Sequence, residues 1–167
     1  MADEIRYLTG ESLDEVYGIE VECFRTPWEL GALERDLNTN PCARYMGVFR
    51  DGRLIACGCL WLMMEEAHVM SVAVRPAQRG AGVGERLMRA LIQAAADGGA
   101  RFMELECRAG NEPAKRMYHK LGFLRVGCRK GYYVDTGEDA YVYAKIDMPA
   151  GHPENDPFLR AGDGECR

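Results

Sequence analysis

Residues 79–84, Arg-Gly-Ala-Gly-Val-Gly, place a cation and three glycines directly before an expected amphipathic helix. They follow Val72-Ala73-Val74, a run typical of a β-strand. A glycine loop at the start of a helix leaves backbone N–H groups unobstructed where the helix dipole favours anions. The pattern predicts either a tight strand-to-helix turn or a site for a pyrophosphate, and residues further along the chain favour the pyrophosphate.

The segment that follows supplies a carboxylate at Glu106, a helix start at Asn111 and a phenol at Tyr118. A carboxylate can take a proton from an amine and a phenol can give one to a leaving thiolate, so these residue types suit acyl transfer. Each residue also has a plainer interpretation. Glu106, like Glu104, could be an ordinary solvent-facing strand residue. Tyr118 could be a packing residue and Asn111 a helix N-cap.

Composition limits the classes of protein that fit. The 167 residues are 47% hydrophobic, enough for one domain with its own core. A formal net charge of −5 argues against a nucleic-acid binder and is compatible with a cationic substrate. No apolar run approaches the roughly 20 residues that span a bilayer, and the acidic start, residues 1–4, does not resemble a signal peptide. We therefore expect a cytoplasmic protein without nucleic-acid or membrane partners.

The seven cysteines are scattered, and none forms a C-x-x-C pair. They do not cluster with the three histidines, so no metal site is expected. We predict reduced, mostly structural thiols. A nucleophilic Cys107 is the disfavoured alternative, because no histidine lies at a matching position. His68 is interpreted as a structural residue.

The elements that must position these residues form a single α/β unit. Asp51-Gly52 predicts a two-residue hairpin turn, and the capping-box pattern at 26–29 predicts a helix with Pro27 at its first position. Beyond Pro149 the sequence lacks periodicity, so we predict a domain over 1–149 and a flexible tail over 150–167. Hydrophobic periodicity predicts strands at 5–8, 45–50, 54–63, 68–74, 101–107, 123–126 and 140–146, helices from the capping boxes at 12–15 and 26–29, and helices at 84–97 and 112–121.

The glycine loop does not fit two familiar nucleotide-binding motifs. The Rossmann fingerprint needs a third glycine where this chain has Glu85. The region before the loop is an expected antiparallel hairpin, and too little chain follows for a second mononucleotide half. A P-loop would need Gly-Lys-Ser/Thr, which does not follow. The remaining pattern is R-x-x-G-x-G between a strand and a helix.

This pattern resembles the acetyl-CoA pyrophosphate motif of the GNAT acetyltransferase superfamily. Within the superfamily the chain looks most like the bacterial ribosomal-protein-alanine N-acetyltransferases, and the resemblance covers roughly residues 5–148. It implies an α/β (α+β) GNAT fold, with a mixed, mostly antiparallel sheet of about six to seven strands flanked by about four helices. Besides 79–84, it rests on residues 24, 27–28, 66–68, 105–111, 117–118, 121–123, 131–133 and 138–140.

The resemblance also implies roles for individual residues. Glu106 corresponds to the general base, Tyr118 to the general acid and Asn111 to a residue that contacts the coenzyme. Glu85 is a departure, because many relatives carry a basic residue directly after the last glycine. Its carboxylate must then point away from the phosphates, and Arg79 and Arg86 could supply the compensating charge. The expected contacts to acetyl-CoA come from Val72, Ala73 and Val74 and from the loop Arg79, Gly80, Ala81, Gly82, Val83, Gly84 and Glu85.

For the reaction, the resemblance implies direct attack, in a ternary complex with acetyl-CoA, by the N-terminal α-amine of a protein. The expected acceptor is the N-terminal alanine of a small-subunit ribosomal protein. Two alternatives remain open. An enzyme for a small-molecule amine or a lysine side chain would differ in the acceptor groove, expected between the Cys23–Trp28 connection and the Gly127–Glu138 loop. A non-catalytic acyl-CoA-binding sensor would keep the glycine loop without needing Glu106 or Tyr118.

Overall fold

A computed structural model describes residues 2–159 of the chain. One sheet of seven strands has the order β1-β2-β3-β4-β5-β7-β6, and four α-helices flank it within the described range. This confirms the predicted mixed, mostly antiparallel α/β fold. No helix among these residues is long and apolar enough to cross a membrane. The elements are β1 (Glu4–Tyr7), α1 (Leu13–Cys23), α2 (Leu30–Thr39), β2 (Ala43–Arg50), β3 (Arg53–Met63), β4 (Glu66–Val74), α3 (Val83–Asp97), β5 (Phe102–Arg108), α4 (Glu112–Lys120), β6 (Leu124–Tyr133) and β7 (Glu138–Lys145).

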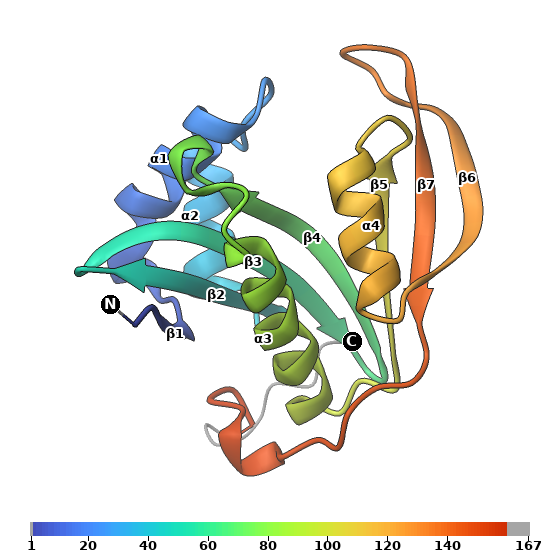
Figure 1. Cartoon of the computed structure of the whole chain (residues 1–167). Coiled ribbons are helices and arrows are strands. Elements are labelled where there is room, and N and C mark those ends of the chain that lie inside the picture. Colours follow the sequence, from blue (N-terminus) through green and yellow to red (C-terminus); the bar gives the residue numbers. More distant parts are fainter. Residues whose placement is uncertain (1, 160–167) are drawn as a thin grey trace.

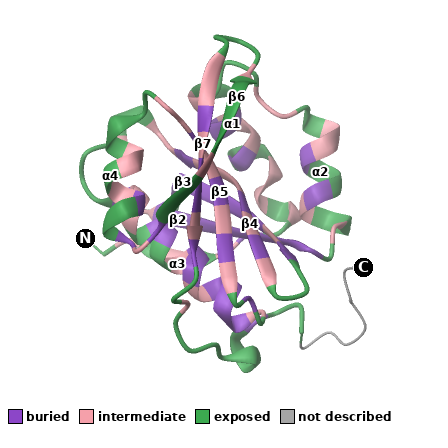
Figure 2. Ribbon diagram, turned by 90° about the vertical axis from the view of Figure 1, so that its right-hand side faces the viewer, coloured by how far each residue is buried: buried purple, intermediate pink, exposed green. Residues whose placement is uncertain are grey.

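The sheet separates two hydrophobic layers. Helices α3 and α4 cover the face turned to the viewer in Figure 1, and α1 and α2 cover the other. Leu87 and Leu91 of α3 are fully buried against one face, while Ile19 of α1 and Leu33 of α2 are buried against the other. In Figure 2 the buried residues gather along the strands between α4 and α2. Burying each such side chain contributes about 1.5–3 kcal/mol, which fixes the scaffold under the site.

Strands β4 and β5 pair with each other only where they begin. Their parallel register runs from Glu66 opposite Phe102 to His68 opposite Glu104. Beyond these residues β4 remains paired with β3 alone, and β5 with β7 alone. The sheet therefore opens between the two strands, as Figure 1 shows. The inner edge of β4 after His68 has no strand beside it, so its backbone groups are available to a ligand.

Two segments differ from the predictions near this opening. Helix α2 begins at Leu30, and the expected helical residues 26–29 are not helical. The reason lies in α1, because the Trp28 N–H donates to Glu20 Oε2 at 3.3 Å instead of starting a helix. The stretch expected as a loop after Val126 is largely strand, since β6 continues to Tyr133 through two register shifts against β7.

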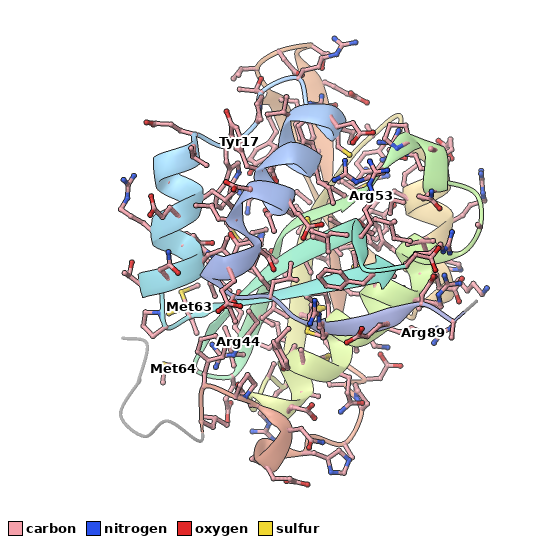
Figure 3. The ribbon with its side chains drawn as sticks, turned by 90° about the vertical axis from the view of Figure 1, so that its left-hand side faces the viewer. Tyr17, Arg44, Arg53, Met63, Met64 and Arg89 are labelled. Carbon is pink, nitrogen blue, oxygen red and sulfur yellow. The ribbon has the colours of Figure 1, made fainter. Side chains whose placement is uncertain are left out.

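The described part of the segment expected as a flexible tail lies against the domain. Asp156 is fully buried and accepts hydrogen bonds from Arg44 Nη2 at 3.0 Å and Nε at 3.3 Å. Figure 3 shows Arg44 on β2 next to the C-terminal segment. The His152 N–H donates to Asp97 Oδ1 at 2.9 Å. Residues 150–159 thus differ from the prediction because a buried ion pair anchors them, and residues 160–167 lie outside the described range.

The cysteines are mostly reduced, as predicted, with one correction. Cys42 on the loop before β2 is disulfide-bonded. The spacing of cysteines along a chain does not show which of them meet in space, so this bond could not be predicted. The described free thiols are Cys23, Cys57, Cys59, Cys107 and Cys128.

Candidate active site

The glycine loop forms the start of α3. Gly80 and Gly82 have φ angles of 80° and 78°, a left-handed conformation that glycine adopts at little cost. Gly82 is the N-cap, and no side chain caps the helix. The Arg86 N–H makes the first intrahelical bond, to the Gly82 carbonyl, at 3.1 Å. The N–H groups of residues 83–85 therefore have no intrahelical acceptor and are open to an anion.

Gly84 leaves the start of α3 without a side chain. A Cβ at this position would meet Val74 Cγ2 at 3.5 Å and Met117 Sδ at 3.7 Å, which are ordinary contacts. Its φ is not in the left-handed region. Neither the packing nor the backbone conformation requires glycine at 84, and its absence of a side chain leaves the helix start open to close approach by a ligand.

Glu85, the departure from the family pattern, is neutralised away from the loop. Its Oε2 accepts a hydrogen bond from Lys120 Nζ on α4 at 2.9 Å, and its Oε1 accepts one from Arg89 at 2.9 Å. The hydrogen bond from Lys120, followed by that from Arg89, lowers the pKa of the carboxyl. The carboxylate is therefore directed toward α4, as the sequence interpretation required.

The two arginines of the loop region differ in availability. Arg86 forms an ion pair with Asp3, and its other contact is a hydrogen bond to the Ala81 carbonyl. Arg79 Nε donates to the Val74 carbonyl at 3.0 Å, and no carboxylate in residues 2–159 forms an ion pair with it. Arg79 is therefore the cation that remains for a phosphate.

A cleft of about 280 Å³ lies where β4 and β5 diverge. It brings together Val72, Glu106, Asn111 and Tyr118, four of the residues singled out from the sequence. Its other end is lined by Phe24, Thr26 and Trp28 of the α1–α2 connection and by Tyr133 of β6, close to where the acceptor groove was expected. Ala73, Val74 and the loop 79–85 do not line this cleft.

Glu106 is held between an imidazole and a guanidinium. His68 Nε2 lies 2.6 Å from Glu106 Oε2, and Arg129 Nε lies 3.3 Å from Glu106 Oε1. The hydrogen bond from His68 is the main cause that lowers the pKa of Glu106, while the same bond raises the pKa of His68 above its usual 6.5. A proton shared by this pair therefore resides on the imidazole and not on the carboxylate.

Tyr118 both packs in the core and reaches the cleft. Its ring centroid lies 5.8 Å from that of Phe123 and 6.1 Å from that of Tyr143. Its hydroxyl makes no hydrogen bond within the described chain. It is not fully enclosed, however, because Tyr7 Oη is the only side-chain nitrogen or oxygen of the described residues that is both buried and without a hydrogen-bond partner. The Tyr118 hydroxyl therefore retains contact with the cleft. Burial raises the pKa of this phenol, so it stays protonated at neutral pH.

Asn111 and Val74 have partners within the protein. Asn111 is the N-cap of α4, and its Oδ1 accepts a hydrogen bond from the Ala114 N–H at 3.3 Å while the residue lines the cleft. Val74 offers less than the sequence suggested, because its carbonyl accepts Arg79 Nε and, at 3.4 Å, the Cys23 thiol. Contacts from β4 to a ligand would therefore come mainly from Val72.

Several residues of the site were missed by sequence reasoning. His68 was interpreted as structural and Arg129 was not considered, because only the divergence of β4 from β5 and the continuation of β6 bring both to Glu106. Arg108 binds Asp135 and stacks on Tyr133 at 4.0 Å, which holds the β6–β7 hairpin against β5.

Cys107 lines the same cleft but is not suited to nucleophilic attack. Burial raises the pKa of its thiol to about 11. Its Sγ donates to the Arg108 carbonyl at 3.5 Å, and it forms no hydrogen bond with a histidine in the described structure. Cys107 is therefore a protonated thiol at neutral pH, and attack through a covalent enzyme intermediate is disfavoured.

The divided sheet, the uncapped start of α3 and the carboxylate and phenol in one cleft are features that an acyltransferase could use. The sequence model of the Acetyltransferase (GNAT) family matches residues 13–123. The chain belongs to this family, which confirms the resemblance seen in the sequence and the class of enzyme, an N-acetyltransferase.

Relatives and a solved structure agree with this assignment. A putative [ribosomal protein bS18]-alanine N-acetyltransferase of Bacillus subtilis is 36% identical over 138 residues, which are 83% of this chain and 91% of the relative. The [ribosomal protein bS18]-alanine N-acetyltransferase of Escherichia coli is 30% identical over 84% of this chain and 95% of its own length. The crystal structure of the ribosomal-protein-S18-alanine N-acetyltransferase from Escherichia coli superposes with a TM-score of 0.81 and 27% identity, over 91% of this chain and 98% of that one.

Proposed function

We propose that this enzyme transfers the acetyl group of acetyl-CoA to the N-terminal α-amine of a protein, the alanine of ribosomal protein bS18 being the acceptor. The observation that carries the proposal is the cleft between β4 and β5. It is lined by Glu106, which is hydrogen-bonded to His68, by the phenol of Tyr118, and by residues of the α1–α2 connection and of β6 that would form an acceptor wall. The names of the relatives support the ribosomal acceptor, and such a substrate implies a cytoplasmic enzyme.

The coenzyme would be held by the start of α3. Acetyl-CoA bound there supplies the activated acetyl thioester. The N–H groups of residues 83–85 and the Arg79 side chain would contact its pyrophosphate, and the free edge of β4 at Val72 would lie along its arm. A backbone N–H on this edge could stabilise the oxyanion that forms during transfer.

The His68–Glu106 pair would receive the proton of the acceptor amine. An α-amine has a pKa near 7.7–8.0 and a lysine about 10.4, so deprotonation at pH 7 costs about 1 and about 4.6 kcal/mol respectively. A modest base is enough for the α-amine. Glu106 lines the cleft and would take the proton directly or through water. Its low pKa weakens it as a base, so the neutral form of the His68 imidazole behind it, the more basic member of the pair, would then hold the proton.

Tyr118 would act at the other end of the reaction. Its protonated hydroxyl faces the cleft without a partner in the described protein, so it can donate a hydrogen bond to the departing sulfur. Burial raises the pKa of the phenol, so its hydroxyl would donate a hydrogen bond to the sulfur in the transition state. It would give up its proton only as the thiolate leaves.

A competition among acceptors tests the proposal. The enzyme and acetyl-CoA are incubated with a peptide that begins as bS18 does, with the same peptide carrying a blocked α-amine and an internal lysine, and with a free polyamine. Mass spectrometry should place acetyl groups on the α-amine of the first peptide. Acetylation of the lysine or the polyamine alone would show that the enzyme acts on another class of acceptor. Binding of acetyl-CoA without any transfer would identify a sensor.

A further inference from the structure

Glu20 is a second carboxylate in the cleft that the reaction described above does not use. It lies on α1 with only 5% of its surface exposed, and it lines the cleft with Ser71, next to Val72 of β4. Its Oε1 accepts a hydrogen bond from Ser71 Oγ at 3.3 Å, and its Oε2 accepts the Trp28 N–H at 3.3 Å. It thus sits between the acceptor wall and the strand that borders the thioester position.

The two carboxylates of the cleft have opposite surroundings. Glu106 is paired with the guanidinium of Arg129 and with the imidazole of His68. Glu20 forms no ion pair with any lysine, arginine or histidine of the described chain, and its two hydrogen bonds come from neutral donors. A carboxylate that is buried without a cation is costly, and burial accordingly raises the pKa of Glu20. Such a cost is often retained where a ligand supplies the missing charge.

We propose that Glu20 is the subsite that binds the acceptor amine, a specificity-determining residue distinct from the base. The inference rests on the proposed function, because it takes a primary amine as the acceptor. A cationic ammonium that enters the cleft meets Glu106, which is already paired with Arg129 and His68, and Glu20, which has no basic partner in the described chain. It pairs with Glu20. Glu20 thereby favours amines over neutral or anionic groups at the same position.

The same contact orients the amine for attack. A primary ammonium has three N–H bonds, so one can remain on Glu20 while another passes its proton to the His68–Glu106 pair. In that transfer the N–H bond breaks, its electron pair stays on nitrogen, and the proton joins the imidazole. The neutral amine is then still held on Glu20 by one N–H, with its lone pair free for the thioester carbon beside Val72.

Binding measured without turnover tests this role. CoA replaces acetyl-CoA, and calorimetry compares a peptide beginning with alanine with the same peptide carrying a propionyl group in place of that alanine, which removes the amine alone. The wild-type enzyme should bind the amine peptide about tenfold more tightly, as expected for a buried hydrogen bond between charged groups. Equal affinities would overturn the proposal.

Glu20→Gln isolates the charge from the packing. A glutamine oxygen can still accept the Trp28 N–H, and its amide can donate to Ser71, so the acceptor wall is kept. The variant should bind both peptides with equal affinity and bind CoA as the wild type does. The control is Glu22→Gln on the same helix, which removes a carboxylate paired with Arg75 outside the cleft lining and should keep the preference for the amine.

Other outcomes contradict the proposal in distinct ways. A Glu20→Gln enzyme that still prefers the amine places the amine elsewhere. One that also binds the propionyl peptide more weakly than the wild type does shows that Glu20 only holds the acceptor wall. If the variant does not fold, the ¹³C resonance of the Glu20 carboxyl in the wild type decides, since it should move on binding of the amine peptide and not of the propionyl peptide. The proposed function is tested separately, by whether the wild type acetylates the amine peptide from acetyl-CoA.

Discussion

The Nε2 of His68 lies 2.6 Å from the Oε2 of Glu106, across the point where β4 and β5 stop pairing. His68 is in the last paired position of β4, opposite Glu104, and Glu106 is two residues further along β5. Residues two apart on a strand point to the same face, so the divergence of the strands lets the imidazole reach the second carboxylate. The feature that opens the cleft therefore also brings the imidazole to Glu106.

The first prediction concerns the pKa of His68. The hydrogen bond to Glu106 is the largest cause that raises it, and burial opposes this effect. In wild-type protein an NMR titration should give a pKa for His68 above 6.5, and in Glu106→Gln the pKa should fall, because the anion that favours the imidazolium is gone. An unchanged His68 titration would show that the two side chains do not interact in solution.

The second prediction concerns the rate of the Glu106→Gln enzyme. At neutral pH it should lose most of its acetyl transfer, about 10²–10⁴-fold, as expected when a positioned general base is lost. The rate should recover partly at high pH, where the amine is deprotonated without help. Glu104→Gln is the matched control, since Glu104 lies on the same strand but outside the cleft lining. If Glu104→Gln shows the greater loss of rate, Glu104 and not Glu106 is the general base.

The strands and their order of appearance followed from local patterns, but the partners of Glu106 did not. The hairpin around Asp51-Gly52 occurs where its turn signal placed it, with strands that are buried on both faces. The helix after the glycine loop occurs where periodicity placed it, because one apolar stripe of that helix faces a single core. His68 looked structural because its role depends on where a parallel pair ends, a property of two segments far apart in sequence. Arg129 required knowing that β6 continues past Val126.

Two failures have the same physical origin. Thr26-Pro27-Trp28-Glu29 has the sequence of a helix start, yet a buried carboxylate on α1 takes the Trp28 N–H and keeps the segment open beside the cleft. The residues after Pro149 have no periodicity, yet Asp156 meets the buried Arg44. In both cases a polar contact with a residue of another element overrides the local signal. Local patterns report propensity and burial, and they do not report which charged groups meet.

The third prediction separates coenzyme binding from folding at Gly84. Replacement by alanine places a Cβ in ordinary contact with its neighbours, and alanine favours a helix over glycine by roughly 1 kcal/mol. Gly84→Ala should therefore unfold at the same or a higher temperature, but bind acetyl-CoA about tenfold or more weakly, a loss of ~1.4 kcal/mol, because the methyl group occupies the approach to the helix N–H groups. Gly18→Ala in α1, where a Cβ has open space, is the control and should keep full affinity. Unchanged affinity in calorimetry for Gly84→Ala would refute the pyrophosphate assignment.

The fourth prediction concerns the C-terminal segment. Asp156→Asn removes the charge that compensates Arg44, whose side chain is only 5% exposed. Leaving a buried charge unpaired should lower the free energy of unfolding by about 3–5 kcal/mol, measured by urea denaturation. Glu65→Gln is the control, since its pair with Arg101 is largely exposed and should have little effect. A small effect of Asp156→Asn would mean that the C-terminal segment is not held against the domain in solution.

The last prediction is that Tyr118 and Glu106 act at opposite ends of the proton path. Both line the cleft. Glu106 is a carboxylate paired with His68 and Arg129, whereas Tyr118 offers a protonated hydroxyl without a partner in the described protein. Tyr118→Phe removes only that oxygen and keeps the ring packed on Phe123 and Tyr143, so the fold and the affinity for acetyl-CoA should persist. Transfer should slow by about 10²-fold, the lower end for loss of a general acid.

The pH dependence distinguishes this loss from that of Glu106→Gln. Alkaline solution deprotonates the amine and so replaces a base, but it supplies no proton to a leaving thiolate. Tyr118→Phe should therefore remain slow at high pH, where Glu106→Gln recovers. Stopped-flow detection of the released thiol across the pH range measures both variants in one assay. A fully active Tyr118→Phe enzyme would make this residue a packing residue whose place as proton donor is taken by water, and alkaline recovery of Tyr118→Phe would assign its hydroxyl to the amine instead of the sulfur.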